Sequence, residues 1–249
     1  MEIQLVRNAT MRIKYGGMLI VTDPFLSPKH TMESFAGISP NPTVDLPMSP
    51  QDAIAGADLV IVSHLHPDHI DPVAIDLLPK AIPLLCQPGD EMTFKRAGFS
   101  AVEPVEMEVE RGGVSITRTP GQHGTGMWAQ QMGAVSGFVL SHPTEPTVYW
   151  TGDTILYRGV TRALELKEPQ VIITHSCGAE FPGSGPIVMD AQQTVALCQI
   201  APEATVVAVH MEALDHAKVS RQELRDYADK KGVRPDRLLI PADGETVSF

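Results

Sequence analysis

Cysteines are few in this sequence, basic residues form no cluster, and no long hydrophobic run is present. The three cysteines lie far apart and include no C-x-x-C pair, which argues against a disulfide framework and suits a reducing compartment. The 19 Lys and Arg residues stand against 30 Asp and Glu residues, so the net charge is −11. Because neutralising phosphates requires a basic face, we expect no nucleic-acid partner.

Targeting and membrane signals are absent as well. The segment Met1–Asn8 has no basic region followed by an apolar one and does not resemble a signal peptide. No apolar run approaches the roughly 20 residues that a membrane-spanning helix needs. We therefore expect a cytoplasmic protein with a small-molecule substrate and no membrane partner, and the sequence leaves a homo-oligomer open.

The hydrophobic pattern predicts strands first and then strands mixed with helices. The segments Glu2–Arg7, Thr10–Tyr15 and Met18–Thr22 form a predicted meander, with a hairpin turn at the glycine pair 16–17. Residues 26–50 hold five prolines and predict a long irregular loop, and such loops are usually functional or mobile. Further strands are expected at 58–63, Pro83–Gln87, Val114–Thr119, Gly137–Ser141, Thr147–Thr151, Val171–His175, Thr205–Val209 and Thr246–Phe249. Helices are expected at Gln51–Gly56, Pro72–Leu78, Asp90–Ala97, Thr161–Leu166, Met189–Ile200 and Arg221–Lys231.

These elements favour one α/β domain over residues 1–249, with helices covering the sheet faces. The length of 249 residues and the hydrophobic content of 43% are ample for such a core. The pattern alone fits a doubly wound single sheet or a sandwich of two sheets flanked by helices. The early meander favours the sandwich.

The most informative segment is Ser63-His64-Leu65-His66-Pro67-Asp68-His69, directly after a predicted buried strand. Neighbouring imidazoles repel one another when charged, whereas a divalent metal binds neutral imidazole and carboxylate together. His64 and His66 project the same way from an extended segment. Asp68 and His69 follow the bend at Pro67 and point elsewhere, which suits two adjacent metals better than one.

A metal centre needs more ligands than one loop supplies. His123, Asp153 and His210 each follow a predicted strand, where the chain leaves the core and can aim a side chain into a common cleft. Each residue taken alone is only a plausible polar residue near a turn. Their recurrence at strand ends favours a shared site.

With these motifs the sequence resembles the metallo-β-lactamase superfamily, through His-x-His-x-Asp-His at 64–69 and then His123, Asp153 and His210 in the family's order. Asp23, after the meander, matches the superfamily's first motif. Within the superfamily the chain is most similar to the group related to L-ascorbate-6-phosphate lactonase, although many relatives carry Gly-His-Ala where residues 7–9 are Arg-Asn-Ala. The resemblance implies an αββα four-layer sandwich of two mixed β-sheets, with metals at one end of the sheets.

The resemblance also implies the roles of the site residues. It puts His64, His66 and His123 on one metal, puts Asp68, His69 and His210 on the second, and makes Asp153 the bridging ligand. The implied enzyme is a binuclear metallohydrolase in which a hydroxide between two divalent ions, zinc first and manganese or iron as alternatives, attacks an ester, lactone or phosphodiester. Asp68 is also a catalytic candidate that orients the nucleophile and carries its proton.

Several other residues have two interpretations each. Asp23 either hydrogen-bonds a ligand histidine or only forms a turn with Pro24, and His216 is either a proton donor to the leaving group or an exposed loop residue. His175 lines the cleft or belongs to the core, and Cys177 is a soft ligand or a small buried residue. Residues 127–128 are interpreted as a flexible flap over the site.

Two functions of other classes compete with the hydrolase. One is an iron-dependent oxidoreductase or oxygenase on the same fold, although the related di-iron enzymes usually carry Glu at the position of His66. The other is a non-catalytic metal-binding protein, which would be expected to have lost ligands. Fold membership alone names no substrate.

Overall fold

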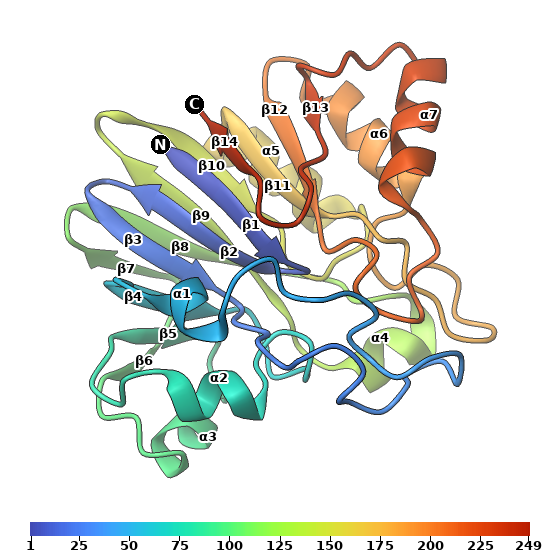
Figure 1. Cartoon of the computed structure of the whole chain (residues 1–249). Helices are drawn as coiled ribbons and strands as arrows, with labels where there is room; N and C mark the ends of the chain where they lie inside the picture. The colour runs from blue at the N-terminus through green and yellow to red at the C-terminus, as the bar shows by residue number, and fades with distance from the viewer.

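Two seven-stranded sheets pack face to face at the centre of the molecule (Figure 1). The computed structural model describes all 249 residues. The first sheet has the order β14-β1-β2-β3-β4-β5-β6, and the second has the order β13-β12-β11-β10-β9-β8-β7. The strands of the first sheet are β1 (Glu2–Arg7), β2 (Thr10–Tyr15), β3 (Met18–Thr22), β4 (Leu59–Val62), β5 (Leu84–Cys86), β6 (Val102–Pro104) and β14 (Thr246–Ser248). Those of the second are β7 (Glu108–Arg111), β8 (Val114–Pro120), β9 (Ser136–His142), β10 (Glu145–Trp150), β11 (Val171–His175), β12 (Thr205–Val209) and β13 (Leu238–Leu239).

Helices cover the outer face of each sheet and give the four layers αββα (Figure 1). The first sheet carries α1 (Pro50–Ile54), α2 (Pro72–Leu77) and α3 (Glu91–Arg96), and the second carries α5 (Arg158–Lys167), α6 (Ala191–Ile200) and α7 (Arg221–Lys230). The expected sandwich is therefore confirmed, and the doubly wound single sheet is excluded. None of the helices has the length and apolar character needed to span a bilayer.

Strand β4 shows how the sequence pattern builds these layers. Its side chains alternate, so that Leu59 and Ile61 pack between the two sheets while Val60 and Val62 pack under the helices of the first sheet. Burying such a side chain stabilises the fold by roughly 1.5–3 kcal/mol. The continuous apolar run thus indicates a strand buried on both faces, as expected.

The layered core brings the functional loops to one end of the molecule. Strands β3, β4 and β5 run parallel in one sheet, and β10, β11 and β12 run parallel in the other. The segments that follow β3, β4, β10, β11 and β12 therefore leave each sheet at its carboxyl edge. Helix α4 (Gly126–Met132) and the long loop before α1 lie at this end too (Figure 1).

The structure differs from the predicted elements at the sheet edges and around residue 126. Strands β6, β7 and β13 were not predicted, because they are two to four residues long and largely lack the apolar alternation of buried strands. Residues 126–132 form a short helix that was not predicted and that includes residues 127–128, which were interpreted as a flexible flap. Glycine at the start of this helix and the absence of buried residues hide the helical signal. The predicted capping box of α7, formed by Ser220 and Glu223, is confirmed.

Candidate metal centre

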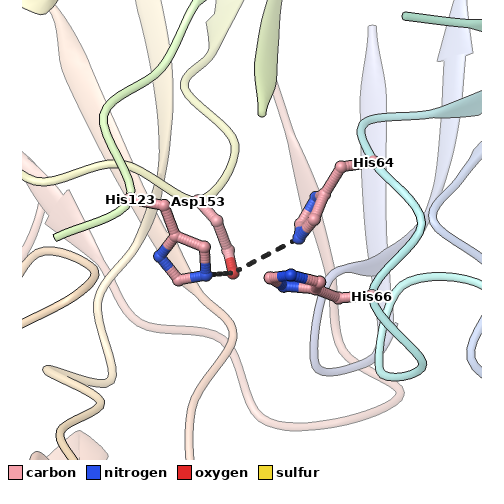
Figure 2. Close-up of side chains that lie close together, drawn as sticks. All are labelled: His64, His66, His123 and Asp153. Carbon is pink, nitrogen blue, oxygen red and sulfur yellow. Dashed lines mark ion pairs between the residues drawn. The ribbon is translucent and has the colours of Figure 1, made fainter. Parts of the chain in front are cut away.

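Two clusters of ligating side chains share one carboxylate at the end of the sandwich. The first cluster contains His64, His66, His123 and Asp153, and the second contains His69, Asp153, His175 and His210. Within each cluster the ligand atoms all lie within 4.8 Å of one another. In the first cluster, the loop after β4 supplies two imidazoles from one side, and His123 and Asp153 approach from the other (Figure 2). Asp68 is in neither cluster, but its Oδ2 lies 3.1 Å from Nε2 of His210 in the second one. The seven side chains predicted as ligands from the sequence therefore converge at one place.

The loop after β4 forms a tight turn that separates its histidines. The amide of His69 donates to the carbonyl of His66 over 2.9 Å, so the chain reverses between these two residues. His69 thereby reaches the second cluster, while His64 and His66 stay in the first. This is the division expected from the bend at Pro67.

Asp23 organises the inner side of the same loop. Its carboxylate accepts hydrogen bonds from the amide of Ser63 at 2.6 Å, from the Ser63 hydroxyl at 2.7 Å and from Nδ1 of His69 at 2.6 Å. The Ser63 hydroxyl then accepts from Nδ1 of His64 at 2.9 Å. Both imidazoles therefore keep a proton on Nδ1 and turn Nε2, the nitrogen that can bind a cation, toward the cluster. The expected hydrogen bond between Asp23 and a histidine of the cluster is therefore present, and Asp23 does more than form a turn.

His123 and His210 are held from the opposite sheet in a similar way. Nδ1 of His123 donates to the carbonyl of Ile187 over 2.8 Å. Nδ1 of His210 lies 3.4 Å from the sulfur of buried Cys177, so this thiol contacts the outer nitrogen of the histidine rather than the cluster. His210 has a positive φ of 61°, and its amide donates to the carbonyl of Asn8. The backbone strain at this strand end aims the imidazole inward.

The inward-facing atoms fit divalent cations. Nε2 of His64 is buried without any hydrogen-bond partner, and Nε2 of His69 and Nε2 of His210 lie 3.2 Å apart. Two such nitrogens at that distance require a shared proton or a shared cation between them. The surrounding donor set of imidazoles and carboxylates is the set that zinc, manganese and iron accept.

Electrostatics keep the carboxylates of the site ionised. Burial opposes their ionisation, but the charges and hydrogen bonds of His69 and His210 hold the pKa of Asp68 and of Asp153 well below the ordinary value. Burial lowers the pKa of His64 well below its usual value. Burial also works against charge on His69, yet the surrounding carboxylates, Asp153 first, outweigh it and raise that pKa to about 10. A cation entering the site must therefore displace a proton from His69.

The structure decides between the two interpretations of several residues. His216 is buried, so its interpretation as an exposed loop residue is wrong, and it lines the cavity beside the clusters. His175 is fully buried and contacts Asp153. The sequence shows only that a histidine stands at the end of a strand and does not reveal this contact. Asn8 lies behind Asp68 and donates to its backbone carbonyl over 2.9 Å.

A cavity of about 170 Å³ opens beside the clusters and has an apolar outer wall. Its lining consists of Phe35, His66, Pro67, Asp68, His123, Met132, Asp153, Phe181, Ile187 and His216, with no Lys or Arg among them. Aromatic rings from separate segments form a continuous row along this wall. Trp128 of α4 stacks on Phe181 with 5.7 Å between ring centroids, Phe181 stacks on His216 at 5.1 Å, and His216 meets Phe35 edge-on at 5.4 Å.

Asp215 attaches the long loop after β3 to this wall. Its carboxylate accepts hydrogen bonds from the Ser34 hydroxyl, from the amides of Phe35, Ala36, Ile38 and Ser39, and from Nδ2 of Asn41. Although burial opposes ionisation, these donors hold the pKa of Asp215 well below its ordinary value. Phe35 thus owes its place over the cavity to a residue 180 positions away in the chain.

Replacing Asp215 by asparagine is expected to lower the free energy of unfolding by roughly 1–3 kcal/mol at neutral pH, because an amide nitrogen would face amide donors. A carboxyl group whose pKa is lower in the folded state than in the unfolded state stabilises the fold at pH values above its unfolded-state pKa. This stabilisation is lost as the pH falls toward the folded-state pKa. The difference between wild type and variant should be constant above about pH 5 and shrink below about pH 4. Urea unfolding across this pH range measures it, and a difference that grows toward acid would contradict the assignment.

Removing metal from the purified protein is expected to lower its melting temperature by roughly 5–10 °C. Ions held at a hundred times their dissociation constant stabilise the fold by about 2.7 kcal/mol, and the empty clusters leave facing nitrogens unpaired. Because His69 must release a proton, metal affinity should rise with pH. Differential scanning fluorimetry with chelator, and after re-addition of Zn²⁺, tests both points. An unchanged melting temperature after verified removal of metal would contradict them.

Comparison with known proteins identifies the domain and its relatives. A model of the β-lactamase superfamily domain matches residues 19–211. The chain is 34% identical to the UPF0173 protein YddR of Bacillus subtilis (strain 168) over 255 aligned positions that cover 100% of both proteins. Its fold is similar to a possible metal-dependent hydrolase from Veillonella parvula DSM 2008, with a TM-score of 0.96 and 32% identity over 100% of this chain and 99% of that one. It is also similar to an isothiocyanate hydrolase from Delia radicum gut bacteria, with a TM-score of 0.93 and 33% identity over 100% and 99% of the two chains.

Proposed function

Because the chain belongs to the metallo-β-lactamase superfamily and, within it, to the UPF0173 family of metal-dependent hydrolases, we propose that it hydrolyses small uncharged electrophiles that carry an apolar substituent. Isothiocyanates are the leading class, and uncharged lactones or esters are the next. Zinc is the first metal to test, since imidazole-rich sites suit it, with manganese and iron after it.

The composition of the cavity wall carries this proposal. The wall offers four apolar side chains, Phe35, Met132, Phe181 and Ile187, and no cationic side chain. Burying a charged substituent without a partner is costly, so the phosphate group of a phosphorylated lactone would meet a wall that does not match it. A volume of about 170 Å³ suits a substrate with one short or ring-shaped substituent. The similar isothiocyanate hydrolase supports the same class.

The reaction is a hydrolysis at an electrophilic carbon. Water adds its oxygen to the central carbon of R–N=C=S, and the resulting thiocarbamate breaks its carbon–nitrogen bond to give R–NH₂ and carbonyl sulfide. A pair of divalent cations in the clusters would supply a water of lowered pKa and polarise the substrate. The chain itself supplies orientation, exclusion of water and proton transfer.

Asp68 and His216 are the residues placed for proton transfer. Asp68 borders the cavity with an ionised carboxylate and is assigned as the acceptor of the proton from the attacking water. Burial lowers the pKa of His216, so its imidazole beside the cavity is neutral and has one N–H and one bare nitrogen. It is assigned to donate a hydrogen bond to the departing nitrogen. The apolar wall excludes bulk water from this transfer.

A substrate panel tests the proposal. The metal-loaded protein should turn over benzyl and allyl isothiocyanate with a kcat/KM at least about 100-fold above that for bis(p-nitrophenyl) phosphate. Released amine, carbonyl sulfide and nitrophenol are the measured products, and a chelated sample is the control. Uncharged and phosphorylated sugar lactones form a matched pair that isolates the effect of charge. Faster turnover of the charged member of either pair would contradict the proposed substrate class.

Replacing Phe35 by alanine should lower kcat/KM for benzyl isothiocyanate by about 10-fold and leave methyl isothiocyanate nearly unchanged. Truncation of Phe35 removes apolar contact with the benzyl ring of the substrate, worth roughly 2 kcal/mol or less of binding free energy. It removes no contact with the methyl group of methyl isothiocyanate. Met107→Ala, which truncates an exposed apolar residue, is the control for removing apolar surface. An equal loss for both substrates would show that Phe35 does not contact the substituent.

A further inference from the structure

His175 lies between the shared carboxylate of the metal centre and the core of the sandwich. Its Nδ1 is 2.5 Å from Oδ1 of Asp153, and its Nε2 is 2.9 Å from the indole nitrogen of Trp150. The ring is fully buried at the end of β11. Distance alone allows two roles, a ligand of the second cation or a support for Asp153.

The contact with Trp150 decides which nitrogen of His175 carries the proton. An indole N–H is a donor only, so Nε2 of His175 accepts from it and must present its lone pair. A neutral imidazole with a bare Nε2 carries its proton on Nδ1. That proton points at Oδ1 of Asp153, and a nitrogen that bears a proton cannot also bind a cation.

The ligand histidines have the opposite arrangement. His69 and His123 donate from Nδ1 to acceptors outside the cluster, which are the Asp23 carboxylate and the Ile187 carbonyl. Each turns Nε2 inward, 3.2 Å and 3.4 Å respectively from Oδ2 of Asp153. His175 faces Asp153 with Nδ1 instead and uses Nε2 toward the core.

We propose that His175 is a positioning residue that donates from Nδ1 to the shared carboxylate and that Trp150 enforces this tautomer. The second cation site is then left to Asp68, the ligand that the family resemblance already implies. The proposal rests on the metal centre of the proposed function. Oδ2 of Asp68 lies 3.1 Å from Nε2 of His210 and 3.5 Å from Nε2 of His69, which places this carboxylate within reach of the same cation.

Trp150 is well placed to impose a tautomer because it cannot move away. Its ring is buried in the core between the sheets and stacks on Phe138 with 5.7 Å between centroids. Its strand β10 pairs in parallel with β11, which carries His175. With Oδ1 of Asp153 held by His175, Oδ2 stays turned toward the ligand histidines of both clusters. The packed core thereby sets the direction of the ligand that the two sites share.

Nitrogen-15 NMR of the protein tests the tautomer directly. Long-range ¹H–¹⁵N spectra separate protonated from bare imidazole nitrogens, and the His175 signals are those that vanish in His175→Asn. We expect a protonated Nδ1 and a bare Nε2 in the metal-free protein and again after saturation with Zn²⁺. In Trp150→Phe a second tautomer with a protonated Nε2 should appear. A His175 Nδ1 that loses its proton on Zn²⁺ binding would overturn the proposal.

Two substitutions of His175 separate support from ligation. Asparagine places an amide nitrogen close to the position of Nδ1 and can still donate to Asp153, whereas alanine cannot. For the positioning role, His175→Asn should bind two equivalents of Zn²⁺ with nearly wild-type affinity, and His175→Ala should bind the second ion about 10- to 100-fold more weakly. For a ligand role, both variants lose one equivalent. Competition with a chromophoric chelator measures the affinities, and Met107→Ala is the control.

Failure of this proposal and failure of the proposed function give different results. The spectra and the Zn²⁺ titrations need no substrate, so they report on His175 even if no isothiocyanate is turned over. If His175→Ala does not fold, Trp150→Phe and the wild-type spectra still decide the tautomer. Loss of the second ion in His175→Asn, with wild-type turnover of isothiocyanates, would overturn the inference and leave the function standing.

Discussion

Replacing Asp153 by alanine is expected to abolish turnover, with kcat falling at least about 1,000-fold, and to weaken binding at both cation sites. The carboxylate lies between the clusters, with Oδ2 3.2 Å from Nε2 of His69 and 3.4 Å from Nε2 of His123. Its other oxygen lies 3.6 Å from Nε2 of His210. No other carboxylate belongs to both clusters, so nothing replaces its negative charge. Metal analysis and steady-state kinetics on the same preparation measure the two effects.

A pair of further variants separates the charge of Asp153 from its shape. Asp153→Asn keeps the size of the side chain and an oxygen that can accept from His175, but it removes the charge, and we expect at least about a 100-fold loss in kcat. Asp190→Asn removes a charge at the start of α6, where asparagine serves equally well as a helix cap, and should behave as wild type. Two equivalents of tightly bound metal in Asp153→Ala would contradict the shared-ligand role.

The buried strands could be predicted because a strand that is buried on both faces has apolar residues at nearly every position. The run at 58–63 is apolar at nearly every position, and the structure packs alternate residues of β4 against both neighbouring layers. The edge strand β7 has no such pattern, since its residues 108–111 are mostly charged and at least partly exposed. An edge strand is set by pairing with its neighbour, here β8, and that pairing is not visible in a local pattern.

The residues of the two clusters could be predicted because most of them follow a strand that ends at the same edge. That rule brings His64, His123, Asp153 and His210 together without knowledge of any distance. The division of the 64–69 loop between two clusters also followed from one proline and the alternation of an extended chain. Local sequence is sufficient here because the scaffold, rather than the loops, sets the geometry.

The role of His175 and the cavity wall could not be predicted, because both depend on contacts between distant segments. The tautomer of His175 is set by Trp150 on the neighbouring strand. Phe35 lies on an irregular loop whose position depends on hydrogen bonds to Asp215. No local sequence pattern indicates this contact, because the two residues are 180 positions apart. For the same reason the sequence left His216 as either a proton donor or an exposed loop residue, because its burial depends on contacts with Phe35 and Phe181.

The two ends of the site therefore differ in how they are built. The inner end consists of ligand residues on strand ends, backed by hydrogen bonds from Asp23, Ser63 and the core. The outer end consists of aromatic residues on loops and on α4, held by stacking and by Asp215. Variation in the outer segments can change the accepted substituent while the hydrolytic centre is preserved. The substrate class should accordingly depend on the residues of the cavity wall, whereas the requirement for metal depends on the residues at the strand ends.

Replacing Asp68 by asparagine is expected to lower kcat by roughly 100- to 10,000-fold, with a smaller effect on KM. The carboxylate borders the cavity on one side and His210 on the other, so the substitution removes both a proton acceptor and a ligand charge. His69 and His210 hold the pKa of Asp68 well below its ordinary value despite burial, so the carboxylate of wild-type Asp68 is ionised at neutral pH. An amide cannot be ionised, so raising the pH should not restore the variant.

The controls for Asp68 use the neighbouring groups. Asp45→Asn removes the same charge from an exposed position of the long loop and should keep wild-type kinetics. Asp68→Glu restores the charge one methylene further out, so it should recover Zn²⁺ affinity more than kcat, because proton transfer depends more steeply on position. If Asp68→Asn kept kcat within about threefold of wild type and bound two equivalents of Zn²⁺, neither role would hold. His175 would then be the remaining candidate for the fourth ligand of the second site, and the argument from Trp150 would fail with it.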